Sequence, residues 1–577
     1  MKKNIILIAI VLFAAVLRFY QLGSNPPSLT WDEVAWGYNA YAIGIDGKDE
    51  FGRFLPVSYL ESFGDYKPPV YAYLDVIPIK IFGLNEFATR FPSAFFGTMS
   101  VFMTYFLVKR LFRTGEKKTF HHQHFIPAKA GIQHTRSPIR ACTRPDRVSG
   151  MALSYNRNEV VALLSAFILA ISPWHSMLSR AAFEANVADF FLIFGVYAFL
   201  RGIQDKSYFL VLSAISFVIT IYTFNTERVV SPLLVIILSL FSLKKLWQMK
   251  AIAITAAITG LLLLLPVIPF LLSPQAKIRF QEVNIFSNVS LVKVSNQEIS
   301  NAHEAWWAKI LDNRRVIYGR EFLKHYFDNL SLNFLFIHGD GNPKFSTQDV
   351  GEMYIWELPF LILGAFFLFR YCEGRWYIIP LWLLIGIIPA ATARETPHAL
   401  RIETTLPTFQ ILVAYGLVTS WLLLKRYKTI FIGTTSAAMV ICLIYFLHGY
   451  YAHYPAEFSG EWQYGYKDSI AYVQSVQDNY DHIVMTNGLG RPYIYYLFYL
   501  KIPPQEFRQT AVIHRDTFGF VDVEGFSKYL FPTGIQPVPG KTLYILQPGD
   551  KVPTGTKLLK TFYLLNGKPS LEAYGTT

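Results

Sequence analysis

Long apolar runs, separated by short basic loops, dominate the chain from residue 4 to residue 448. A membrane-spanning helix needs about 20 mostly apolar residues. The runs that reach or approach this length are residues 4–20, 91–112, 159–174, 185–203, 207–224, 229–243, 251–273, 354–370, 376–392, 404–424 and 429–448. The pattern predicts a polytopic α-helical membrane protein with about eleven transmembrane helices.

The composition agrees with a membrane protein. Charged residues make up 16% of the chain, whereas soluble domains contain roughly 25%. The net charge is +13, but the basic residues stand mostly in short loops between the apolar runs. Lysines and arginines in such loops orient the chain and contact lipid head groups, so the excess does not indicate a nucleic-acid partner.

The basic loops also predict the orientation of the chain. If Lys2 and Lys3 are cytoplasmic and the spans alternate, every loop that falls on the cytoplasmic side is basic. The N-terminus is then cytoplasmic. The first span has no small-residue cleavage site after it, so we expect it to remain uncleaved.

Three long segments then lie outside the cytoplasm. They are the first loop, residues 21–90, a large loop, residues 274–353, and the tail, residues 449–577. In the tail, residues 470–476 and 492–500 favour helices, and residues 481–485 and 542–546 favour strands. We expect a transmembrane domain over residues 1–448, followed by a small soluble α/β domain over residues 449–577.

Residues 117–158 interrupt the pattern on the cytoplasmic side. This stretch is polar, rich in His and Arg, and without periodicity, which is typical of an inserted loop. His121, His122 and His124 are not accompanied by clustered carboxylates or thiols, so the pattern does not favour a metal site there.

Two adjacent acids follow the first span, in the motif Trp31-Asp32-Glu33. At the membrane surface, desolvation and a neighbouring like charge both raise the pKa of a carboxyl group, which suits a general base. The alternative is a helix N-terminus, where Thr30 caps the helix and the early acids complement its dipole.

A lysine precedes two prolines in the motif Lys67-Pro68-Pro69, at the start of an apolar segment too short to span a membrane. The prolines restrict the backbone, so the ammonium group is presented in a defined place and can hold a phosphate. The alternative is a lysine that buries its stem and extends its charge to the interface.

Further charges lie at the predicted outer turns. Arg180 and Glu184 are four residues apart on one helix face, so a simple ion pair is one explanation for them. Residues 222–228 and 394–401 form two further charged clusters that could bind a ligand. The alternative for both is a solvated turn between two spans. Charges at the outer ends of consecutive spans suit a ligand with a phosphate head and a lipid tail.

The motifs together resemble a known family. Residues 17–19, 31–33, 67–69 and 90–94 are similar to those of the bacterial members of the protein O-mannosyltransferase superfamily, and residues 172–186 and 398–407 are similar as well. These proteins have the GT-C glycosyltransferase fold and are related to the aminoarabinose transferase that modifies lipid A. The resemblance covers most of residues 5–448.

The resemblance implies an inverting transfer of a sugar from a polyprenyl-phosphate donor, in the plasma (inner) membrane of a bacterium or archaeon. The active site and C-terminus are expected outside the cytoplasm, and the acceptor is a protein hydroxyl, a lipid or a cell-envelope glycan. The expected catalytic residues are Asp32, Glu33 and Glu184. The residues expected to bind the donor phosphate are Lys67, Arg228, Arg394, His398 and Arg401.

No metal-binding motif is visible. Asp32 and Glu33 could hold a divalent ion, but basic residues already match the phosphate, so a metal cofactor is not favoured. A transporter or flippase for lipid-linked sugars and a sugar polymerase or ligase remain alternative functions. A transporter is expected to have polar residues near the bilayer midplane, whereas these charged clusters fall on one side.

Overall fold

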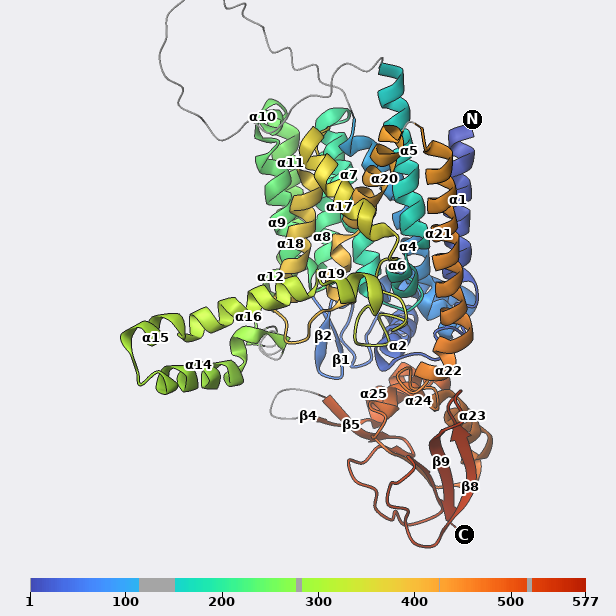
Figure 1. Cartoon of the computed structure of the whole chain (residues 1–577). Helices are drawn as coiled ribbons and strands as arrows, with labels where there is room; N and C mark the ends of the chain where they lie inside the picture. The colour runs from blue at the N-terminus through green and yellow to red at the C-terminus, as the bar shows by residue number, and fades with distance from the viewer. Residues whose placement is uncertain are drawn as a thin grey trace, which may run out of the picture.

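The computed structural model describes residues 2–113, 151–274, 276, 283–424, 426–515 and 521–576. A bundle of long helices adjoins a smaller unit of strands and short helices that contains the C-terminus, and the N-terminus lies at the far end of the bundle (Figure 1). Residues 117–150 of the predicted insertion lie outside the described residues. From Met151 onward the chain is helical, so the end of that predicted loop belongs to the next span.

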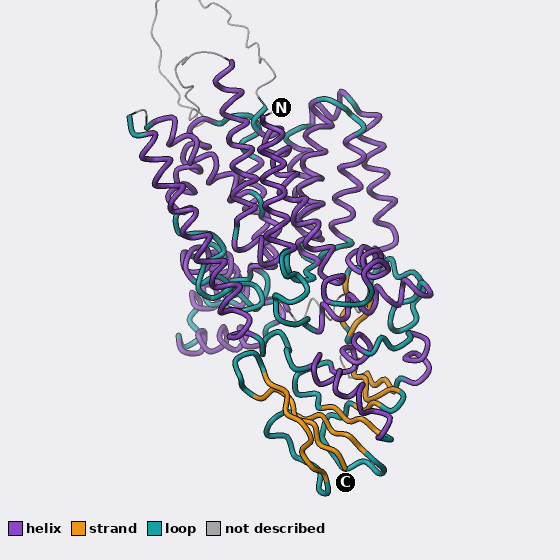
Figure 2. The backbone as a smooth tube through the Cα atoms, turned by 90° about the vertical axis from the view of Figure 1, so that its right-hand side faces the viewer, coloured by secondary structure: helices purple, strands orange, loops and turns teal. Residues whose placement is uncertain are grey.

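Within the described residues, each predicted span coincides with a helix of the bundle, and these helices run roughly side by side (Figures 1 and 2). They are α1 (Lys2–Phe19), α4 (Glu86–Leu111), α5 (Met151–Ile171), α7 (Glu184–Gln204), α8 (Phe209–Ile221), α9 (Glu227–Leu240), α11 (Lys250–Leu264), α17 (Glu357–Tyr371), α18 (Ile378–Ala391), α20 (Thr408–Leu423) and α21 (Lys428–His448).

Four helical stretches among the described residues are long and apolar enough by themselves to cross a membrane. They are Glu86–Leu111, Glu184–Gln204, Lys250–Leu271 and Lys428–Phe458. A fifth is added if two helical segments, Ala399–Thr405 and Thr408–Leu423, count as one span with a bend of 58° between them. Exposed apolar side chains along α21, such as Ile430, Ile441 and Ile444, fit contact with lipid. A membrane location follows, and the count of eleven spans stays a prediction.

Shorter elements connect the bundle helices. In the first loop they are α2 (Trp31–Asp46), β1 (Leu60–Ser62), β2 (Asp65–Lys67) and α3 (Val70–Phe82). Elsewhere they are α6 (Pro173–Leu178), α10 (Leu243–Gln248), α12 (Ile268–Leu271), α14 (Val289–Asn301), α15 (Trp306–Leu311), α16 (Arg314–Asp328) and α19 (Ala399–Ile402).

The C-terminal unit is a mixed sheet flanked by short helices. The order of its seven described strands is β4-β5-β6-β3-β7-β9-β8, and β3 runs parallel to both β6 and β7. The strands are β3 (His482–Met485), β4 (Val512–Arg515), β5 (Val521–Phe526), β6 (Tyr529–Leu530), β7 (Thr542–Leu546), β8 (Thr556–Tyr563) and β9 (Pro569–Thr576). The helices are α23 (Tyr466–Val476), α24 (Pro492–Tyr499) and α25 (Pro504–Thr510).

The four elements predicted in the tail are present as α23, β3, α24 and β7. Helix α21 does not stop at residue 448, because a π-helical segment (Gly449–His453) and α22 (Tyr454–Phe458) continue it. The helix thus continues beyond residue 448, and the boundary between the two domains stays a prediction.

The C-terminal unit packs against α2 of the first loop. Val34 and Tyr38 of α2 belong to the same apolar core as Ile494 and Leu497 of α24. The Tyr38 hydroxyl donates to the carbonyl oxygen of Ile502 at 3.0 Å. The tail thus supports the helix that carries the two candidate acids.

Two glycines allow α17 and α20 to approach closely. A Cβ on Gly364 would lie 1.9 Å from the carbonyl oxygen of Leu412, and one on Gly416 would lie 2.1 Å from that of Phe360. Small residues at such contacts let helix backbones pack directly against each other in membranes.

We expect Gly364→Ala to force these two backbones apart and to lower the midpoint of thermal unfolding in detergent. Overpacking of this kind costs about 1–3 kcal/mol. The matched control is Gly433→Ala in α21, where an added Cβ meets no atom within 4 Å. Equal midpoints for the two variants would contradict the close contact.

Candidate functional site

A cavity of about 680 Å³ lies where hairpin β1–β2 meets the starts of α2, α7 and α9 and the turn before α19. Its apolar wall includes Val229, Phe270 and Leu271. Its lining also contains most of the charged residues expected from the sequence, namely Asp32, Lys67, Glu184, Arg228, His398 and Arg401. The cavity therefore joins a polar centre to an apolar side.

Asp32 and Lys67 form an ion pair in this cavity, in which the Lys67 ammonium donates to Oδ1 of Asp32. The Lys67 side chain is 8% exposed and that of Asp32 is 52% exposed. The rings of Trp36 and Phe63 flank the ammonium, with centroids 5.2 and 5.5 Å away. Asp32 thus presents its carboxylate to the open space, while Lys67 is held from behind.

The hairpin fixes where Lys67 points. Its two turn residues, Phe63 and Gly64, both have positive φ angles, 60° and 77°, as a tight two-residue hairpin turn requires. Pro68 and Pro69 then end the strand. The position of the ammonium is set by this rigid local backbone.

The electrostatic environment keeps Lys67 charged. Burial by itself would lower the pKa of Lys67, but the negative charges of Asp32 and Asp65 outweigh it and raise the pKa above the ordinary value. Lys67 is therefore a cation at any physiological pH.

Arg228, in the first turn of α9, is a half-buried guanidinium with spare donors. Its Nε and Nη2 have no hydrogen-bond partner within the described part of the chain. The group lies 5.5 Å from the centroid of the Phe270 ring. Buried donors without partners cost free energy, so an anion bound in the cavity would relieve that cost.

Helix α19 and its N-cap residue contribute one charged group, Arg401, and one neutral group, His398. Nη1 of Arg401 donates to the carbonyl oxygen of Glu395 at 3.2 Å, at the edge of the cavity. Burial, and then the charge of Arg401, lower the pKa of His398 to about 3. His398 is therefore neutral at physiological pH, and its 3.7 Å contact with Asp340 is not an ion pair there.

Arg394 is placed differently from the expectation. It is not among the residues that line the cavity; its Nε donates to the carbonyl oxygen of Asn284 at 3.2 Å. Asn284 does line the cavity. Arg394 therefore supports the wall rather than facing the open space.

Glu184 begins α7 and lines the cavity. It does not form the simple ion pair with Arg180 that the spacing allowed. Arg180 is 1% exposed and donates to the carbonyl oxygens of Leu17 and Asn25 at 2.9 and 2.8 Å. The backbone at and just after the end of α1 therefore binds Arg180. Glu184 instead lies within electrostatic range of Lys67 and Asp32.

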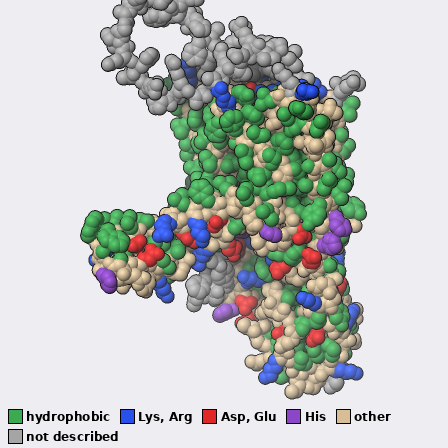
Figure 3. Space-filling view, viewed as in Figure 1, with side chains coloured by type: hydrophobic (Ala, Val, Ile, Leu, Met, Phe, Trp, Pro, Cys, Tyr) green, Lys and Arg blue, Asp and Glu red, His purple; other side chains and the backbone are tan. Residues whose placement is uncertain are grey.

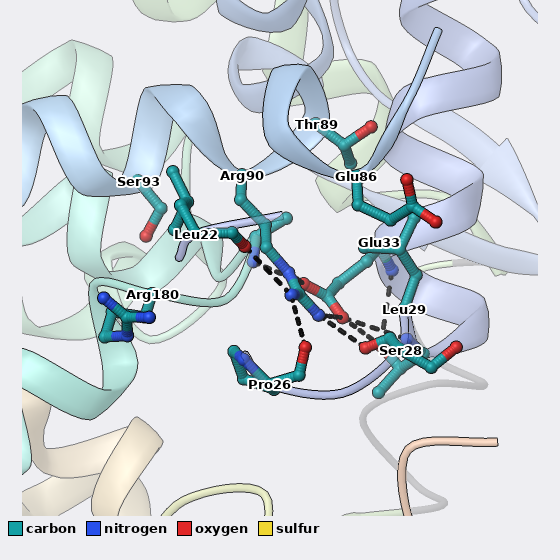
Figure 4. Close-up of polar contacts among 12 residues, drawn as sticks. Leu22, Pro26, Ser28, Leu29, Glu33, Glu86, Thr89, Arg90, Ser93 and Arg180 are labelled. Atoms are coloured by element: carbon teal, nitrogen blue, oxygen red, sulfur yellow. Dashed lines mark hydrogen bonds and ion pairs between the residues drawn. The ribbon is translucent and has the colours of Figure 1, made fainter. Parts of the chain in front are cut away.

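Glu33 does not line the cavity and instead belongs to a buried network (Figure 4). Its carboxylate accepts hydrogen bonds from the backbone N–H groups of Thr30 and Ala182, both at 2.9 Å. Nε of Arg90 donates to the same carboxylate at 2.8 Å, and both side chains are 0% exposed. The remaining Arg90 donors reach the carbonyl oxygens of Leu22, Pro26 and Ser28.

Thr30 also accepts a hydrogen bond from the backbone N–H of Glu33, so the two residues form a capping box at the start of α2. Glu33 therefore has the structural role at a helix N-terminus that was the alternative to catalysis. Asp32, the preceding residue, lines the cavity. The structure does not bring Glu33 to the position expected for a catalytic acid.

Two charged residues to which the sequence assigned no role also line the cavity, Asp65 and Lys344. Asp65 is two positions before Lys67 in β2, and alternate residues of a strand share a face, so this spacing was a usable signal. Lys344 lies in the large loop, with its ammonium 5.1 Å from the centroid of the Trp31 ring. No local pattern marked it.

Sequence comparison supports the resemblance over the N-terminal region. Residues 8–115 match the family model of dolichyl-phosphate-mannose-protein mannosyltransferases, a segment that contains Asp32 and Lys67. An uncharacterized protein of Aquifex aeolicus is 33% identical over 121 residues, which are 21% of this chain and 22% of that protein. The matched segment thus spans about a fifth of the length of that relative.

Structural comparison covers the whole chain. The crystal structure of ArnT from Cupriavidus metallidurans in the apo state has a TM-score of 0.51 and 11% identity, with 98% of this chain and 97% of ArnT covered. The same protein bound to undecaprenyl phosphate gives a TM-score of 0.49 at 12% identity. At this identity the likeness shows the fold. The chain therefore has a GT-C-like fold and, in its N-terminal segment, resembles the dolichyl-phosphate-mannose-protein mannosyltransferases, as its motifs predicted.

Proposed function

We propose that the chain is an inverting glycosyltransferase that moves a sugar from a polyprenyl-phosphate-linked donor to an extracytoplasmic acceptor. The observation that carries the proposal is the cavity in which Asp32, Lys67 and Arg228 adjoin an apolar wall. A lipid phosphate requires cations for its head group and an apolar path for its tail. ArnT, whose fold is similar, has been crystallised with undecaprenyl phosphate.

The donor phosphate lies between Lys67, Arg228 and Arg401. Lys67 is already held as a cation, and Arg228 has donors that an anion would satisfy. His398 adds a neutral hydrogen-bonding group, and Arg394 acts indirectly through Asn284. The prenyl chain leaves the cavity along the side formed by Val229, Phe270 and Leu271.

The transfer is a single displacement at the anomeric carbon. The oxygen of the acceptor hydroxyl bonds to that carbon as the bond to the phosphate oxygen breaks, and the electron pair stays on the phosphate. Asp32 takes the hydroxyl proton. Preorganised cations stabilise the charge that develops on the leaving phosphate. Attack opposite the leaving group inverts the anomeric configuration.

The two other expected catalytic acids have different roles in this proposal. Glu184, beside the Asp32–Lys67 pair, orients the sugar or the acceptor. Glu33 holds the start of α2 through Arg90 and thereby directs Asp32 into the cavity. If the acceptor is itself a phosphate, no base is needed, and Asp32 instead stabilises positive charge on the sugar ring.

The proposal includes a topology and a division of labour. The N-terminus is cytoplasmic, and the cavity and C-terminal unit lie on the extracytoplasmic side of the plasma membrane. The transmembrane domain, residues 1–448, holds the donor. The C-terminal unit and the large loop at residues 274–353 select the acceptor, because they flank the cavity on its aqueous side.

The central test is Asp32→Asn in purified protein reconstituted in lipid nanodiscs. A panel of polyprenyl-phosphate sugars and acceptors is incubated with the protein, and mass spectrometry follows the products. Loss of a positioned base lowers the rate about 10²–10⁴-fold, so kcat falls by that factor while donor binding persists. The control is Asp468→Asn, the same chemical change at an exposed carboxylate outside the cavity.

A folded Asp32→Asn protein with the wild-type rate would refute the role of Asp32 as base. Movement of an intact lipid-linked sugar across the bilayer, without bond cleavage, would instead favour the transporter alternative. Products with several sugars added in succession would favour a polymerase.

Lys67→Met should weaken donor binding and also lower kcat, because Lys67 holds the donor phosphate and stabilises the charge that develops on it. A hydrogen bond to a charged group contributes about 1.5–3 kcal/mol, so KM for the donor should rise by about tenfold or more. Lys48→Met, at an exposed lysine of the same loop, serves as the control. An unchanged donor KM would remove Lys67 from the phosphate site.

Activity should persist after exhaustive dialysis against EDTA. Basic side chains neutralise the phosphate in this proposal, and the described residues contain no group of three or more His, Cys, Asp and Glu placed to hold a metal ion. Inactivation by EDTA and recovery with Mg²⁺ or Mn²⁺ would show instead that a divalent ion shares the phosphate with Lys67.

A further inference from the structure

An arm of three helices projects sideways from the bundle, at the end that holds the cavity (Figure 1). It consists of α14, α15 and α16, with α15 at its outer tip. Where α16 returns to the bundle, the hydroxyl of Tyr326 donates to the carbonyl oxygen of Leu384 in α18 at 2.9 Å. The arm is therefore fixed at its root and free at its tip.

The tip exposes large apolar side chains. In α15, Trp306 is 76% exposed, Trp307 48%, Ile310 59% and Leu311 58%. Two exposed tryptophans next to two exposed aliphatic residues are unusual on a surface that meets only water, and such patches mark interaction sites.

The apolar surface continues along α16. Val316, Leu323 and Phe327 are 40%, 54% and 62% exposed, and their spacing of seven and four residues places them on one face of the helix. The opposite face packs inward, where His325 is buried and contacts the carbonyl oxygen of Ala393 at 2.8 Å. The exposed apolar face is thus distinct from the face that joins the bundle.

The position of the arm identifies its partner. Figure 3 shows hydrophobic side chains gathered on the outer end of the arm, on the side toward the apolar belt of the bundle, and the arm lies at the lower edge of that belt. This is the height at which a bilayer surrounding the bundle meets water. Tryptophan concentrates at this interface, because its ring is apolar while its N–H remains hydrated.

The charges on the arm suit the same partner. Arg314, Arg315 and Arg320 are exposed on α16, where they would lie at the height of lipid phosphates. Helix α14 forms the branch farther from the bundle and exposes polar residues such as Lys293 and Gln297. The largest exposed apolar side chains thus lie on α15 and α16 with basic neighbours, whereas α14 exposes polar residues together with Val289 and Val294. Such a division is typical of helices that lie on membranes.

We infer that α14–α16 form an interfacial anchor whose tip, Trp306, Trp307, Ile310 and Leu311, inserts into the lipid leaflet on the cavity side of the membrane. The root of this anchor also builds the cavity wall. The backbone N–H of Ile285 donates to the carbonyl oxygen of Thr392 at 2.9 Å, and Thr392 lines the cavity. The anchor thereby holds that wall at a set height above the bilayer, whichever reaction the cavity performs.

The test places an environment-sensitive NBD fluorophore on the tip through Ile310→Cys, in a chain whose Cys142, Cys372 and Cys442 are replaced by serine. The matched control carries the label at Gln297→Cys on α14. Both proteins are reconstituted in phosphatidylcholine nanodiscs with or without lipids that bear a doxyl quencher near the head group.

At position 310 the emission should shift to the blue and be quenched by the doxyl lipid several-fold more strongly than at position 297, which should report water. Water-like emission at both positions would overturn the inference. A blue shift at position 310 without quenching by the doxyl lipid would also overturn it, because the patch would then be covered by protein, for example by a second copy of the chain.

Discussion

The geometry of the cavity depends on the buried ion pair between Glu33 and Arg90. Two charges away from water are costly unless every donor and acceptor is satisfied, and removing one partner of such a pair costs about 3–5 kcal/mol. Here Arg90 uses all of its donor nitrogens, and the Glu33 carboxylate also accepts backbone N–H groups from two separate segments. The pair therefore locks the start of α2 against α4 and against the turn before α7. Asp32, one residue earlier, lines the cavity and pairs with Lys67.

The rest of the site is assembled around that fixed point from distant parts of the chain. Lys67 comes from a rigid hairpin, Arg228 from the start of α9 and Arg401 from the turn between α18 and α20. Arg180 contributes without entering the cavity, since it ties the end of α1 to the turn that leads to Glu184. The C-terminal unit supports α2 through Tyr38 and its apolar neighbours. Asp32 and Lys67 line the cavity, whereas Glu33, Arg90 and Arg180 are buried and hydrogen-bonded behind it.

The surroundings of the cavity have three kinds of surface. The cavity has an apolar wall that includes Phe270, the C-terminal unit packs against α2, and the arm reaches along the edge of the apolar belt. In the reaction that we propose, a lipid-linked donor and a water-borne acceptor would approach Asp32 from different directions. The inverting displacement that we propose would use this separation, since its two oxygens must lie on opposite faces of the sugar carbon.

The amino-acid sequence by itself determined the bundle helices, the main elements of the tail, and Asp32, Lys67, Glu184, Arg228 and Arg401 as charges near one face. Hydrophobic runs and short turn motifs act over a few neighbouring residues, so the helices and strands that they form can be predicted from the sequence. The division of roles between Asp32 and Glu33 was decided only by the tertiary structure, because it depends on Arg90, 57 positions away from Glu33. The same holds for Arg394, which supports Asn284, and for Lys344, which reaches Trp31 from a long loop. The partner of a charged side chain is set by the packing of remote segments, and no local spacing encodes it.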